Sequence, residues 1–64
     1  MIVRKVKDAI AEKPIFVIHD DQLNKVTSVS KQPFEDQYIL EWLDKMGKEH
    51  YGVFGDDDLI FQES

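Results

Sequence analysis

The stretch that decides the expected fold is PFEDQYILEWLDKMG, residues 33–47. Its apolar side chains recur at the spacing of a helix, and its leading proline suits a first helical turn. Glu35 and Asp36 complement the positive end of a helix dipole, and Gly47 suits a left-handed C-cap. The stretch therefore predicts an α-helix that begins at its proline and ends just before its glycine.

Such a helix would carry an unusually wide apolar surface. Its apolar and aromatic arc spans about 200°, against about 100° for an ordinary surface helix. One interpretation is that this helix forms the centre of the core. The other is that part of the arc, especially Tyr38, Leu40 and Trp42, faces a second copy or another protein, because interface centres favour aromatic residues.

The first segment, residues 1–13, has the pattern of an amphipathic helix. Ile2, Val6 and Ile10 fall on one helical face, and Pro14 ends the segment. Residues 1–5 could instead form a strand, because they are rich in β-branched side chains.

Two further regions have the composition of β-hairpins. Residues 15–18 are four apolar residues with high β propensity, and turn-forming residues separate them from a second strand-like run. A hairpin of residues 15–19 with 25–30 is therefore expected. Residues 50–54 and 59–61 flank an acidic turn, which predicts a second, shorter hairpin or a loop leading into one final strand.

These elements together predict a single α+β domain over residues 1–64. Its order is α-β-β-α-β(β), and two helices cover a small antiparallel sheet made of two short hairpins or of three to four strands. A chain of 64 residues without cysteine has no disulfides to support its small core. The core must then suffice alone or be completed by a partner.

The formal net charge of −5 is gathered in the second half of the chain. Residues 33–64 carry nine carboxylates and two lysines, a net charge of −7, whereas residues 1–13 carry +2. An acidic half repels phosphates, so direct binding of nucleic acid is not expected. The longest apolar run has four residues, so no membrane contact is expected, and the absence of cysteine fits a cytoplasmic location.

The side chains that could carry chemistry do not form a recognised motif. Asp56, Asp57 and Asp58 lie in a turn but lack the spacing of a calcium-binding loop. His19 and His50 are 31 positions apart, and two histidines with nearby aspartates are a weak zinc signature. No catalytic residue, no metal ligand and no cofactor is therefore assigned, and the chain is not expected to be an enzyme.

The remaining hypothesis is a small acidic interaction protein of the cytoplasm. It would act as an inhibitor or regulator by binding a basic protein surface, such as that of a nucleic-acid-handling protein. The alternative is a self-associating structural or accessory subunit, a dimer for example, with no separate target. The residues predicted to contact the partner are Tyr38, Leu40, Glu41, Trp42, Asp44, Asp56, Asp57 and Asp58.

Overall fold

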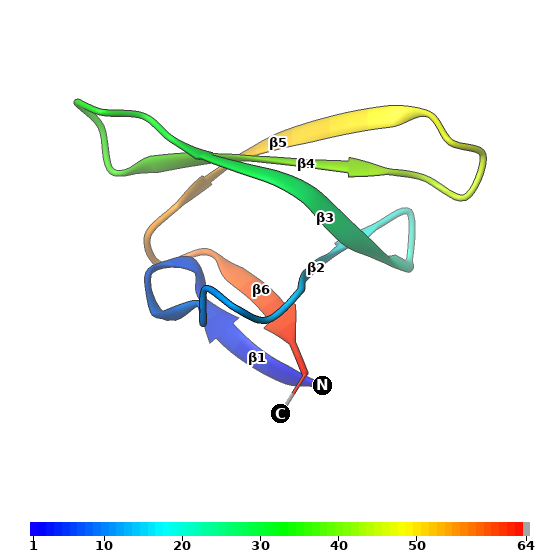
Figure 1. Cartoon of the computed structure of the whole chain (residues 1–64), viewed down its shortest axis with the longest axis horizontal. Helices are drawn as coiled ribbons and strands as arrows, with labels where there is room; N and C mark the ends of the chain where they lie inside the picture. Colours follow the sequence, from blue (N-terminus) through cyan, green and yellow to red (C-terminus); the bar gives the residue numbers. More distant parts are fainter. Residues whose placement is uncertain (64) are drawn as a thin grey trace.

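The computed structural model describes residues 1–63 and contains six β-strands and one short 3-10 turn within that range (Figure 1). The elements are β1 (Ile2–Lys5), η1 (Val6–Asp8), β2 (Ile15–His19), β3 (Gln22–Lys31), β4 (Gln37–Leu43), β5 (Glu49–Gly55) and β6 (Leu59–Gln62). All neighbouring strands are antiparallel, in the spatial order β1-β6-β2-β3-β4-β5.

The long strand β3 joins the two halves of the sheet. Its first part pairs with β2 and its last part with β4, and the register shifts between Val26 and Ser28. A bulge of this kind bends a strand and increases its twist. The halves therefore fold over one another, with β3, β4 and β5 on one side of the molecule and β2, β6 and β1 on the other (Figure 1).

The core lies between the inner sides of these two halves. Leu40 and Trp42 enter it from β4, Val17 from β2 and Ile60 from β6, while Val6 closes one end. Gly52 pairs with Leu40, and a Cβ there would lie 2.9 Å from the Phe54 ring and 3.4 Å from the Trp42 ring. This core is small, as expected for a chain of this length.

The expected helix over residues 33–46 is wrong. Residues 37–43 form β4, and they alternate between the core and the outer surface. Tyr38, Leu40 and Trp42 face inward at a period of two, a pattern that the helical reading overlooked because Ile39 and Leu43 are apolar as well. Gly47 does adopt a left-handed conformation, with φ of +80°, but in the turn between β4 and β5.

The expected N-terminal helix is also wrong, and the fold is not α+β. Residues 2–5 form β1, which confirms the alternative of a strand at this end, and only three residues follow as a 3-10 turn. Within residues 1–63 there is no α-helix, so the protein is an all-β antiparallel sheet. The β-branched residues Ile2 and Val3 favour the extended conformation, and pairing with β6 stabilises it.

The first expected hairpin forms, but residues 16–19 pair with 22–25 across a tighter turn, and residues 26–31 pair with β4 instead of β2. β2 and β3 pair antiparallel, and the turn is Asp20-Asp21, with φ of 51° and 58°. Positive φ at both central residues is the geometry whose twist matches paired strands. Asn24 supports the turn, because its side-chain amide donates to the carbonyls of Gln22 (2.9 Å) and His19 (3.4 Å).

The second expected hairpin is wrong, because its two strands do not pair with each other, but the alternative of a loop that leads into one final strand is confirmed. β5 pairs with β4, and β6 crosses to the other half of the sheet, where it lies between β1 and β2. The acidic turn therefore connects the two halves of the molecule and is not the tip of a hairpin.

Candidate functional site

The three apolar residues predicted to contact a partner lie on the inner side of β4. Trp42 is 6% exposed and Leu40 is 1% exposed, so both are core residues in the folded chain. Tyr38 is half-buried at the end of the strand, and the Lys31 ammonium lies 5.6 Å from the centre of its ring. Of the predicted residues on β4, Glu41 is the one exposed on the outer side.

The three aspartates of the acidic turn make contacts within the chain. The Asp57 carboxylate lies 3.4 Å from the Lys5 ammonium and 3.6 Å from that of Lys7, and Lys5 first and then Lys7 lower its pKa. Asp58 accepts a hydrogen bond from the Gly55 amide (2.6 Å). The carbonyl of Asp56 accepts one from the Lys7 amide (3.1 Å). The turn thus anchors the basic N-terminal segment of its own chain.

Asp44 organises the turn between β4 and β5. One carboxylate oxygen accepts hydrogen bonds from the amides of Met46 and Lys48, both at 2.9 Å. The other oxygen lies 2.9 Å from Nε2 of His50. The hydrogen bond with His50, followed by that from the Lys48 amide, lowers the pKa of Asp44 from 3.8 to about 2.

This lowered pKa predicts a loss of stability in acid that depends on Asp44. A carboxyl whose pKa is lower in the folded state stabilises the fold above its unfolded value, and the contribution is lost as pH falls through the folded value. We expect the free energy of unfolding of wild type to exceed that of Asp44→Asn at pH 5, and the difference to shrink between about pH 4 and pH 2. Urea titrations at several pH values measure this difference. A difference that stays constant down to pH 2 would contradict the role of the ionised carboxylate.

The two histidines lie together, which their separation in the sequence does not suggest. The ring centres of His19 and His50 are 4.6 Å apart, and the Trp42 indole lies 5.5 Å from His19 and 6.1 Å from His50. Trp42 pairs with His50 across β4 and β5, and the end of β2 brings His19 beside them, which no local spacing signals. Sequence reasoning therefore missed the cluster.

The cluster has carboxylates beside it but lacks the arrangement of a catalytic or metal site. His50 is held by Asp44, and His19 lies 3.4 Å from its own neighbour Asp20. Residues 1–63 contain no group of three or more histidine, cysteine or acidic side chains placed to hold a metal ion. The serines Ser28 and Ser30 pair with Glu41 and Ile39, on the outer side of the sheet and away from the imidazoles.

The outer side of β4 and β5 presents apolar residues next to carboxylates. We call it the acidic outer face, and its members are Ile39, Glu41, Leu43, Glu49, Tyr51 and Val53. Tyr51 is 73% exposed and lies opposite Glu41, and Leu43 lies opposite Glu49. β5 is the last strand of the sheet, so its outer edge is unpaired within residues 1–63.

The outer side of the other half is mostly apolar and carries no carboxylate among its strand positions, although Lys5 pairs there with Leu59 and Lys25 with Phe16. We call it the apolar outer face, and its members are Val3, Phe16, Ile18, Leu23, Leu59 and Phe61. Val3, Phe61 and Phe16 form a row across three strands, and Ile18 pairs with Leu23. Four of the six are about half exposed. Clusters of this kind on small proteins mark contact surfaces.

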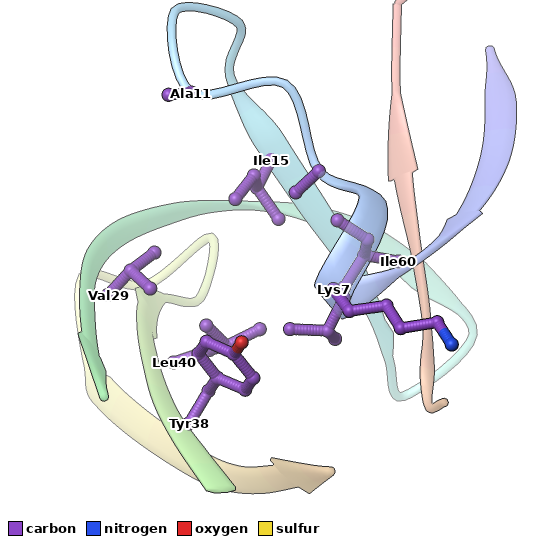
Figure 2. Close-up of a pocket in the computed structure, with 9 residues that line it drawn as sticks. Lys7, Ala11, Ile15, Val29, Tyr38, Leu40 and Ile60 are labelled. Atoms are coloured by element: carbon purple, nitrogen blue, oxygen red, sulfur yellow. The ribbon is translucent and has the colours of Figure 1, made fainter. Parts of the chain in front are cut away.

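An open apolar cavity of about 370 Å³ lies between the inner side of β4 and the segment that leads from η1 to β2. Figure 2 shows Tyr38, Leu40 and Val29 on one wall and Ile15 and Ile60 on the other. Val6, Lys7, Ala9 and Ala11 complete the lining. The ammonium of Lys7 points away from the cavity (Figure 2), so the walls are apolar apart from the Tyr38 hydroxyl.

None of the helical segments within residues 1–63 has the length and apolar character needed to cross a membrane. Comparisons of the chain with models of protein families, with curated proteins and with solved structures find no match.

Proposed function

We propose that this protein is a non-enzymatic interaction protein whose acidic outer face binds a basic, partly apolar surface of another protein. One observation carries the proposal: Tyr51 is largely exposed between Glu41 and Glu49 on a free edge strand. A rigid aromatic residue supplies binding energy, and surrounding carboxylates select a partner of opposite charge.

The charges elsewhere on the chain support the choice of this face. The lysines nearest the acidic turn are already paired with Asp57, and Asp44 is engaged with His50. Glu41 and Glu49 are exposed, and the residues of β4 and β5 include no lysine or arginine. Their negative potential is therefore free to attract a basic surface, such as that of a protein that handles nucleic acid. For a cysteine-free chain we propose the cytoplasm as the compartment.

A charge-reversal experiment tests the proposal. Immobilised wild type is compared with Glu41→Lys/Glu49→Lys in lysate of the source organism, at about 0.05 M and about 0.3 M salt. The matched control is Glu12→Lys/Glu63→Lys, which changes the net charge equally at exposed positions elsewhere. We expect a basic partner to be retained by wild type and the control, lost from the face variant, and weakened by salt.

The purified partner then allows a quantitative measurement. We expect Tyr51→Ser to raise Kd by at least about 30-fold, the effect of an aromatic residue at the centre of an interface. Equal affinity of wild type and the face variant, or equal loss in the face variant and the charge-matched control, would contradict the proposal.

A second candidate function, a self-associating subunit, is favoured by the apolar outer face. That face has six apolar side chains over β1, β6, β2 and β3, and burial between two copies would remove them from water. Ile18→Asp places a charge on this face, where Ile18 pairs with Leu23. A dimer that sedimentation detects for wild type but not for Ile18→Asp would support this candidate.

A further inference from the structure

The cavity beside β4 is an incomplete part of the core. It is bounded by Leu40 and Ile60, which belong to the buried cluster, and by half-exposed Val29. An apolar cavity of about 150 Å³ is enough to hold a benzene ring. The volume here, about 370 Å³, therefore accommodates an aromatic side chain with its first backbone atoms.

The chain itself carries an aromatic side chain without a packing partner. Phe34, at the tip of the loop between β3 and β4, is 97% exposed. A phenylalanine side chain buries roughly 150–250 Å² of surface when it packs. Because Phe34 is exposed, this hydrophobic stabilisation is absent from the single chain. The tip is narrow, since Gln32 donates to the Gln37 carbonyl (2.9 Å) and Glu35 to that of Gln32 (3.4 Å).

We propose that two copies of this chain pair by inserting Phe34 of each into the cavity of the other. The tip continues β3 and β4 away from the body of its own molecule (Figure 1). Its own cavity is lined by Val29 and Tyr38 of those same strands, so Phe34 reaches it only if the tip folds back and breaks the Gln32–Gln37 hydrogen bond. A second copy places the ring there without rearranging either hairpin.

Symmetry makes this exchange reciprocal. The tip and the cavity adjoin at the same end of β3 and β4, because Lys31 and Tyr38 form the last pair before the loop. A two-fold axis at that end brings each tip over the cavity of the other copy, which is the contact pattern of an isologous dimer. Each cavity is then completed by a residue of the partner copy.

Charge favours the same arrangement. The residues that follow Phe34 are the exposed carboxylates Glu35 and Asp36. Lys13 borders a shallower pocket of about 170 Å³ that shares Ala11, Ile15 and Val29 with the cavity. The acidic tip of one copy would thus approach Lys13 of the other, which favours a second copy over an uncharged small molecule as the occupant.

Two single variants interrupt the contact from opposite sides. Phe34→Ser removes the inserted ring, and the exposure of Phe34 means that the fold of one copy does not depend on it. Val29→Phe fills the cavity from its own wall and blocks entry, and Ala11→Phe does the same from an exposed position if Val29→Phe fails to fold. We expect wild type to sediment as a monomer–dimer mixture between about 10 µM and 1 mM, the range of weak interfaces. Each variant should be folded by circular dichroism and monomeric.

A mixture of the two variants is the decisive measurement. Phe34→Ser keeps an open cavity and Val29→Phe keeps an intact tip, so a mixed pair regains one of the two insertions. We expect the mixture to form heterodimers that neither variant forms alone, with at least a tenfold weaker affinity than wild type. Glu41→Lys/Glu49→Lys should dimerise like wild type, because the acidic outer face is not involved.

Four results would overturn the proposal. The first is a strictly monomeric wild type at 1 mM. The second is a Phe34→Ser dimer that Ile18→Asp abolishes, which would assign the contact to the apolar outer face. The third is a failure of the mixture to associate when each single variant is folded. Binding of benzene to wild type with no change in its sedimentation would assign the cavity to a small apolar ligand instead.

Discussion

Trp42→Ala should remove most of the free energy of unfolding of the protein at 25 °C. The indole extends from β4 into the core, stacks with His50 at an interplanar angle of 17° and lies next to Gly52. Loss of a buried tryptophan costs about 3–5 kcal/mol. A domain of this size has a total stability near the low end of about 5–15 kcal/mol, so one substitution removes most of it.

Circular dichroism with urea denaturation measures this effect, because the variant lacks the single tryptophan that fluorescence would report. Tyr51→Ala is the matched control: it removes an aromatic ring from the outer side of the neighbouring strand, and we expect a change within about 0.5 kcal/mol. If Trp42→Ala remains as stable as Tyr51→Ala, the inner side of β4 is not the core.

This contrast bears on the hypothesis that Trp42 contacts a partner. A residue at a dimer seam can be replaced while the monomer remains folded, whereas replacement of a core residue unfolds the monomer. The structure places Leu40 and Trp42 in the core, and Glu41 between them on the outer side. The residues that would form one wide apolar arc on a helix are divided in β4 between the inner side, which faces the core, and the outer side.

The ambiguity of residues 37–43 has a physical origin. Apolar residues at 39, 40, 42 and 43 fit a helix, and those at 38, 40 and 42 fit one side of a strand. Both sides of β4 carry apolar residues, so the usual alternation of apolar and polar residues is obscured. The β propensity of Tyr38, Ile39 and Trp42 was the available signal for the strand.

The elements that could be predicted are those determined by residues close together in the sequence. The hairpin of β2 and β3 follows from two β-rich runs around the turn-forming Asp20-Asp21, and the left-handed Gly47 follows from its freedom at positive φ. The crossing of β6 to pair with β1 and β2 depends on contacts between the two ends of the chain. Such pairing leaves no signal in the local spacing of residues.

The same distinction applies to the candidate site. The excess of carboxylates was visible in the sequence, and Glu41 is exposed as a partner-contacting residue must be. The sequence did not show which carboxylates are already paired within the chain, because Asp57 contacts Lys5 and Asp44 contacts His50 only in the folded protein. Tyr51 and Glu49 lie on the same face as Glu41 because β5 pairs with β4, and the sequence did not predict that pairing.

Gln62→Glu should destabilise the protein by about 3–5 kcal/mol at pH 7, because its side chain clamps the N-terminal segment to β6. Gln62 is fully buried (0% exposed). Its carbonyl oxygen accepts from the Ile10 amide (2.9 Å), and its amide nitrogen donates to the carbonyls of Ile10 (2.9 Å) and Lys13 (3.1 Å). A carboxylate cannot donate, so both carbonyls would lose their partner and face a negative charge.

The pH dependence separates this clamp from a simple packing effect. Burial and the two carbonyls raise the pKa of the introduced carboxyl in the folded state, so the deficit relative to wild type should shrink as pH falls from about 7 to about 4 and a donor returns. Gln62→Met removes the hydrogen bonds without adding charge, and we expect a deficit of about 2–4 kcal/mol that does not change with pH. Urea titrations of the three proteins measure both deficits. A Gln62→Glu deficit below about 0.5 kcal/mol at pH 7 would show that the segment from η1 to β2 is not held by this side chain, and the wall of the cavity would then lack its support.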